Sequence, residues 1–138
     1  MSSFIIDTDC LISYVTDRNP RQTEKIAEIL ENASDLKYEI FIISNVITEF
    51  VYTLQSVYEQ NPKLISRMLS DLFSNPGIEY IHSYNIDIIL NLWPNKIKDY
   101  GDSIVAAAAL EHTVPILTFD KAFSTQLADI RVKHQLLR

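Results

Sequence analysis

The sequence predicts an α/β protein built as a three-layer sandwich, with helices on both faces of a central parallel sheet of four to five strands. Short, continuously apolar runs such as residues 40–43 are typical of buried strands. They alternate with longer segments whose apolar residues recur at helical spacing, and this alternation is typical of parallel sheets. Because 138 residues are the size of one domain, we expect a single domain over residues 1–138.

The individual elements follow from the apolar pattern and from capping residues. We expect strands at residues 4–7, 39–44, 78–81 and 116–119, with a short fifth strand at the sheet edge at 128–132. We expect helices at residues 10–15, 21–32, 46–57, 62–73, 85–92 and 102–111. Ser44 and Asn45 are suited to cap the third helix, and Asn61 precedes a proline suited to the first position of the fourth.

Composition and charge limit the function classes. A net charge of −6 argues against a broad basic face for nucleic acid, but not against an enzyme that meets phosphates through bound cations. No apolar run approaches the ~20 residues of a membrane span, and we expect no signal peptide. The single cysteine, Cys10, is expected to pack as a small apolar residue, and the reducing cytoplasm is the expected location.

Four acids stand at the expected strand ends and helix starts. Asp7 ends the first strand, Asp120 follows the fourth, Glu49 lies one turn into the third helix, and Asp102 opens an alanine-rich helix. The carboxyl ends of parallel strands share the edge where ligands bind, so we expect these side chains to converge there. Taken singly, Asp7, Asp102 and Asp120 could instead cap helices, and Glu49 could face solvent.

Such a cluster would be electrostatically unfavourable without a compensating charge. Two carboxylates about 5 Å apart repel by roughly 3 kcal/mol at an effective dielectric constant near 20. Hard divalent cations with oxygen ligands, Mg²⁺ or Mn²⁺, offset this repulsion. The acids therefore predict a metal site, and no Ser-His-Asp or Cys-His arrangement points to a side-chain nucleophile.

The acids belong to four short motifs spread over residues 4–132. These are Asp7-Thr8-Asp9 with Leu11-Ile12, Glu49 after a strand, Asp102-Ser103-Ile104-Val105-Ala106-Ala107, and Thr118-Phe119-Asp120 with Phe123. As a set they resemble the PIN domain, and the closest branch is the short, single-domain VapC-type toxins.

The resemblance implies a ribonuclease that cleaves single-stranded or exposed RNA with Mg²⁺ or Mn²⁺. It implies that the metal ligands are Asp7, Glu49, Asp102 and Asp120, with the Thr118 hydroxyl next to the last acid. It also implies a homodimer and an antitoxin protein that covers the acidic groove. Asp9 stands where the family often has Asn or Ser, and is a possible further ligand.

Basic residues close to these motifs are the candidates for contact with RNA. They are Arg18, Lys98 and Lys121, with Arg21, Lys25 and Lys96 nearby. Asp99 is expected to be a solvated charge at a helix start, with a supporting role at the metal as the alternative.

Two other functions use the same residues. Asp7-Thr8-Asp9 also matches the opening motif of haloacid-dehalogenase-like phosphatases, in which the first Asp is a nucleophile. That family's late metal motif requires a further acid about four residues after Asp102, where this chain has Ala106, and Glu49 would have no role. The second alternative is a non-catalytic PIN-like module that binds RNA or protein.

Overall fold

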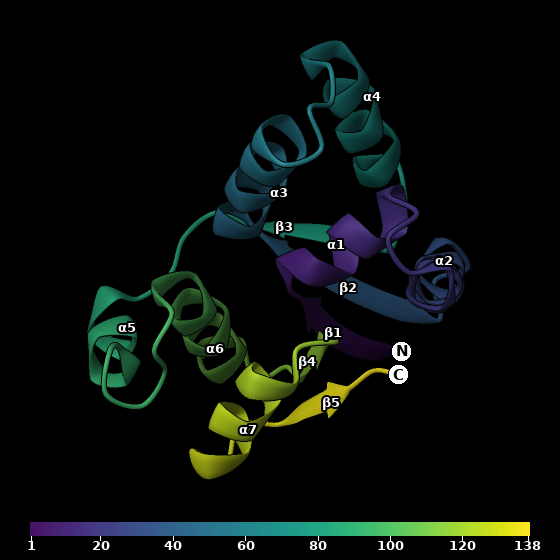
Figure 1. The fold of residues 1–138 in the computed structure, drawn as a ribbon. Helices are drawn as coiled ribbons and strands as arrows, with labels where there is room; N and C mark the ends of the chain where they lie inside the picture. The colour runs from purple at the N-terminus through teal and green to yellow at the C-terminus, as the bar shows by residue number, and fades with distance from the viewer.

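A computed structural model describes all residues 1–138 and shows one parallel sheet covered by helices on both faces (Figure 1). The sheet has five strands in the order β3-β2-β1-β4-β5. The strands are β1 (Ser2–Ile6), β2 (Tyr38–Ile43), β3 (Ile78–Ile81), β4 (Ile116–Thr118) and β5 (His134–Leu136). The helices are α1 (Thr8–Val15), α2 (Pro20–Ser34), α3 (Ser44–Ser56), α4 (Pro62–Phe73), α5 (Ile86–Leu92), α6 (Tyr100–His112) and α7 (Lys121–Asp129). The expected fold class is confirmed.

The strand order places a topological switch between β1 and β4. The chain first moves from β1 to β2 and β3, then returns past β1 to β4 and β5. In Figure 1, β1 runs between α1 and α2 on one side and α6 and α7 on the other. All pairings are parallel, with Ile5 opposite Ile116 and Ile6 opposite Leu117. The residues that follow β1 and β4 therefore meet at one edge, where doubly wound sheets bind ligands.

The core is one cluster of 34 buried residues, and α6 lies deepest in it. Residues 103–109 of this helix are all buried, and four of them are consecutive alanines. A helix buried all round has no polar stripe, and its small side chains allow close packing on the sheet. Cys10 is fully buried as expected, and its thiol contacts the Leu117 carbonyl at 3.5 Å. The chain contains no helix with the length and hydropathy needed to cross a bilayer.

The expected position of the fifth strand and the expected cap of α3 are wrong. The segment 128–132 is not a strand: Asp120 caps α7, which runs to Asp129, and the next turn places Arg131 in the left-handed region at φ 58°. The fifth strand lies at His134–Leu136 instead. Neither Ser44 nor Asn45 caps α3, because both are already helical and Ile43 occupies the cap position without a side-chain bond.

The alanine-rich helix begins two residues earlier than expected, at Tyr100. Its cap is Asp99, whose carboxylate accepts from the Asp102 N–H at 2.9 Å. Asp102 therefore lies in the first turn, not at the cap, and this frees its carboxyl for other contacts. Asp99 is exposed at the helix start, as expected.

Candidate active site

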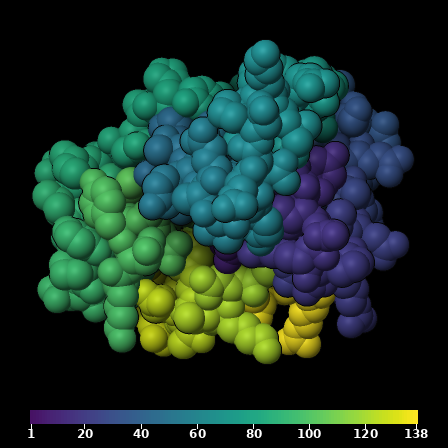
Figure 2. Space-filling view, turned by 45° about the horizontal axis from the view of Figure 1, so that its top comes forward, coloured from purple at the N-terminus to yellow at the C-terminus, as the bar shows by residue number.

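The four predicted acids line one small pocket at the carboxyl edge of the sheet. The pocket has a volume of about 170 Å³ and is lined by Asp7, Thr8, Asp9, Glu49, Asp99, Gly101, Asp102, Val105 and Asp120. Its side chains come from segments far apart in the sequence. Purple α1, teal α3, green α6 and yellow-green α7 meet on one face of the molecule in Figure 2. Six carboxylates and one hydroxyl line this pocket, and no basic side chain does.

Asp7 is held rigidly behind the pocket. It follows β1, is only 5% exposed, and accepts hydrogen bonds from the Thr118 hydroxyl and from the Cys10 N–H. Burial raises the pKa of Asp7 to about 6, although the hydrogen bond from Thr118 acts in the opposite direction. The Thr118 hydroxyl in turn accepts from the Asp120 N–H at 3.0 Å. Thr118 thus connects the residues that follow β1 and β4.

Asp120 and Asp7 cap helices and line the pocket at the same time. Asp120 accepts from the Phe123 N–H at 3.0 Å and so begins α7, as Asp7 begins α1. A cap uses one carboxylate oxygen and fixes the rotamer. The other oxygen of Asp120 accepts no hydrogen bond, whereas the other oxygen of Asp7 accepts from the Thr118 hydroxyl and keeps a second lone pair. The capping alternative is therefore correct for these two residues, and it does not remove them from the site.

Glu49 reaches the pocket from the first turns of α3. Its carboxylate accepts from the Asn45 amide at 2.9 Å and from the Thr8 hydroxyl at 3.2 Å. Burial raises its pKa, and these two hydrogen bonds lower it. Gly101 makes room for this side chain, because a Cβ there would lie 2.1 Å from Glu49 Oε1 and 3.2 Å from Asp99 Oδ1.

Asp102 has the most perturbed acidity of the cluster. Burial is the largest cause, and together with the neighbouring charges of Asp99, Asp7, Asp120 and Glu49 it raises the pKa of Asp102 to about 8. Unlike Asp7 and Glu49, its carboxylate accepts no hydrogen bond that would offset these effects. Asp102 is therefore the acid that gains most from a cation.

Asp9 is the only acid of the site with a basic partner. Its carboxylate lies 3.9 Å from the Arg18 guanidinium, which also donates to the Asp9 carbonyl at 3.0 Å and to the Ser13 hydroxyl. Burial raises the pKa of Asp9, and the Arg18 charge lowers it. The Arg18 side chain thus contacts Asp9 and Ser13 of α1, and its contact with RNA remains a prediction.

The donor set suits a hard divalent cation. Carboxylate and hydroxyl oxygens are the ligands that Mg²⁺ and Mn²⁺ prefer, and raised acid pKa values indicate negative charge that lacks compensation. As the side chains are arranged, no three His, Cys, Asp or Glu residues form a ready coordination shell. A bound ion would require the pocket carboxylates to turn towards a common point.

The other predicted basic residues lie outside the acid pocket. Lys98 is exposed, and its backbone N–H donates to Gln126. Lys121 and Arg21 line a separate hollow, and Lys25 faces a third, which also holds Glu24, Glu28 and Glu31. Lys96 is exposed on the segment between α5 and α6.

A family model described as PIN domain matches residues 4–126. The chain belongs to the PIN domain family. This match decides against the haloacid-dehalogenase-like alternative, in agreement with the position of Glu49 inside the pocket. No curated protein sequence matches the chain.

Solved structures share the PIN fold at low sequence identity. PAE2754 from Pyrobaculum aerophilum has a TM-score of 0.68 at 14% identity, over 98% of this chain and 84% of that one. VapBC-1 from nontypeable Haemophilus influenzae has a TM-score of 0.64 at 16% identity, over 96% of each chain. VapBC2 from Rickettsia felis, bound to a DNA fragment from the promoter, has a TM-score of 0.62 at 17% identity, over 89% of this chain and 92% of that one.

Sequence reasoning did not find several residues that shape the pocket. Gly101 was not assigned a role, although a glycine next to a helical acid is a signal for close approach. The sequence did not indicate that Asn45 and Thr8 hold the Glu49 carboxylate. Asn45 lies one turn before Glu49 on α3, and Thr8 lies on another helix, α1.

Proposed function

We propose that this PIN protein is a metal-dependent endoribonuclease that hydrolyses RNA phosphodiester bonds. The observation that carries the proposal is the convergence of Asp7, Glu49, Asp102 and Asp120 on one pocket of about 170 Å³ at the switch point of the sheet. Arg18, paired with Asp9, is the only cation that offsets any of the six carboxylates, so the pocket suits a phosphate only when a divalent cation lies between them.

The residues have distinct tasks in this proposal. Asp7, Glu49, Asp102 and Asp120 would hold Mg²⁺ or Mn²⁺, with Asp9 as a possible further ligand. When bound, the cation supplies Lewis-acid chemistry: it neutralises charge on the phosphate and activates water. Thr118 orients Asp7 through its hydroxyl, and Asn45 and Thr8 orient Glu49. No protein nucleophile is required, and Cys10 is buried away from any substrate.

Cleavage of a labelled single-stranded RNA tests the proposal. With Mn²⁺ or Mg²⁺ the wild-type protein should cut internal bonds, and chelator should abolish cutting. Asp102→Asn should lower the rate at least about 100-fold, the size of effect seen when a key electrostatic group is lost. Asp87→Asn is the matched control, since Asp87 also lies in the first turn of a helix and is exposed outside the pocket.

Four results would contradict the proposal. Metal-independent cleavage, or cleavage that survives Asp102→Asn, would exclude the acid pocket as the site of reaction. Release of phosphate from a small phosphomonoester, lost on Asp7→Asn, would indicate a phosphatase. A protein that binds RNA but never cuts it would support the non-catalytic alternative.

We also propose that the protein acts in the cytoplasm as the toxin of a toxin-antitoxin pair and forms a homodimer. Support comes from similarity in fold to proteins described as VapBC and FitAB complexes. The acid pocket would be covered by a basic segment of the antitoxin, because that charge complements its carboxylates. Growth arrest on expression, absent for Asp102→Asn, tests the toxin role, and light scattering tests the dimer.

A further inference from the structure

A second hollow lies beside the acid pocket at the same edge of the sheet. Its volume is about 500 Å³, within the usual range for small-molecule sites. It is formed by the start of α2 and by the segments after β4 and β5, and its lining is Asn19, Arg21, Gln22, Phe119, Lys121, Leu136, Leu137 and Arg138. The two cavities are neighbours along the chain, because Asp120 lines the acid pocket and Lys121 lines this hollow.

The hollow is cationic in a protein of net charge −6. Arg21, Lys121 and Arg138 are exposed, and no acid lines the hollow with them. Arg21 and Arg138 also line the adjoining hollow that holds Glu24, Glu28 and Glu31, whereas Lys121 does not. The one ion pair of the chain joins Arg18 to Asp9, so none of these three cations has an acidic partner within 4.0 Å. Unpaired cations gathered in a cavity favour an anionic ligand.

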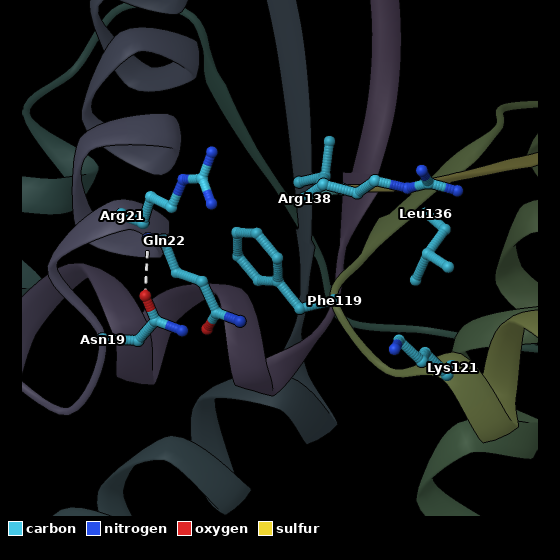
Figure 3. Close-up of a pocket in the computed structure, with 8 residues that line it drawn as sticks. Asn19, Arg21, Gln22, Phe119, Lys121, Leu136 and Arg138 are labelled. Atoms are coloured by element: carbon cyan, nitrogen blue, oxygen red, sulfur yellow. Dashed lines mark hydrogen bonds between the residues drawn. The ribbon is translucent and has the colours of Figure 1, made fainter.

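The neutral polar groups of the hollow are also arranged as donors. The Asn19 side-chain oxygen accepts from the Gln22 N–H, and the Gln22 side-chain oxygen accepts from the Ser13 hydroxyl. Both amide oxygens are therefore engaged within the protein, and the two NH₂ groups remain free to donate. Figure 3 shows the Asn19 to Gln22 bond at the start of α2.

An aromatic ring stands in the middle of the hollow. Phe119 lies between the α2 residues Arg21 and Gln22 on one side and Lys121 on the other (Figure 3). It is only half-buried, with Leu136 beside it in the lining. An aromatic face among unpaired cations is the combination by which proteins hold single-stranded nucleic acid, with bases stacked and phosphates neutralised.

We propose that this hollow binds one nucleotide of a single-stranded RNA whose neighbouring phosphodiester lies at the acid pocket. The base stacks on Phe119, while Arg21 and Lys121 contact the phosphates on either side of it. This inference rests on the proposed ribonuclease function. It adds a subsite that requires an unpaired strand, because a base inside a duplex could not enter the hollow.

Binding measured without cleavage tests the subsite. The probe is a fluorescent ten-nucleotide single-stranded RNA of mixed sequence, titrated in chelator at low salt and followed by anisotropy. Replacing both cations (Arg21→Gln with Lys121→Gln) should weaken binding about tenfold or more. The slope of log K against log salt concentration should become flatter by about 1.4, because each lost phosphate contact removes about 0.7. Phe119→Leu should weaken binding at least about fivefold with the salt slope unchanged.

The matched control is Lys63→Gln, in the first turn of α4. Lys63 is exposed and lines neither the hollow nor the acid pocket, so its loss should change affinity less than about twofold. Thermal melting of each variant must remain close to wild type; Phe119→Leu keeps an apolar side chain for this reason. Equal affinity of all variants, or no binding by wild type, overturns the subsite.

Failure of the subsite and failure of the ribonuclease function give different results. If wild type cuts RNA with Mn²⁺ and the hollow variants bind and cut equally well, only the subsite is wrong. If wild type cuts nothing but Phe119→Leu and the double variant still lose RNA binding, the subsite stands and the ribonuclease function is wrong. If a polyglutamate peptide displaces the RNA while duplex and single strand bind equally, the hollow belongs to an acidic protein partner and the subsite is overturned.

Discussion

Neutralising Asp102 should stabilise the metal-free protein. Burial, with the charges of Asp99 and Asp7 adding to it, raises the pKa of Asp102 from 3.8 to about 8. The folded state therefore disfavours the carboxylate, whereas the unfolded chain, with its acids dispersed, does not. Asp102→Asn replaces the group by a neutral side chain of the same shape, so the free energy of unfolding should rise in chelator.

The magnitude follows from the pKa difference. Each pH unit between the folded and unfolded pKa corresponds to about 1.4 kcal/mol. Asp102 is only partly buried, so solvent screening reduces the total, and we expect Asp102→Asn to gain about 1–3 kcal/mol at pH 8. The gain should depend on pH. Because the folded pKa is raised, wild type loses stability as pH increases from about 4 to about 8, and the variant loses less.

Denaturant unfolding at pH 4, 6 and 8, in chelator and with Mn²⁺, measures these effects. At pH 4 the two proteins should differ little, since Asp102 is then protonated in the folded wild type. Mn²⁺ should stabilise wild type more than Asp102→Asn, because a cation that binds only the folded state stabilises it according to its concentration over Kd. An equal gain in the free energy of unfolding at pH 4 and pH 8, or equal stabilisation of both proteins by Mn²⁺, would refute an electrostatic origin of the stability difference. Asp87→Asn should change neither property.

Three further substitutions probe how the pocket is held. Gly101→Ala should push the Glu49 carboxylate away and lower the rate of RNA cleavage at least about tenfold. Helix propensity alone favours the alanine variant by up to about 1 kcal/mol in stability. Full cleavage activity would contradict the contact. Thr118→Val should lower the free energy of unfolding by about 1–3 kcal/mol, measured in urea, because it leaves the buried Asp7 without its hydroxyl donor; an unchanged midpoint would argue against it. Asp99→Ala should melt at a lower temperature than Asp99→Asn through a capping loss of about 0.5–2 kcal/mol, because both variants remove the charge that acts on Asp102 and only asparagine can cap; equal melting temperatures of the two variants would exclude capping.

The fold and the position of the four acids were predictable because both depend on local patterns. An apolar run followed by an acid determines a strand end, and parallel strands bring their carboxyl ends to one edge. Asp7 and Asp120 could be placed from this rule alone, and Glu49 and Asp102 from their positions one turn or less into the following helices. The fifth strand could not be placed, because the alternating Ala128, Ile130 and Val132 fit a strand as well as a helix end.

Tertiary structure alone decided how the acids are held and what lies beside them. The sequence does not indicate that Thr118 bonds to Asp7 across 111 positions, or that Glu49 occupies the space a side chain at Gly101 would fill. It also gives no sign that Arg21, Phe119 and Arg138 line one cavity. Local propensity depends on neighbours within a few residues, whereas these contacts arise from the order of strands in the sheet. That order brings the start of α2 beside the ends of β4 and β5.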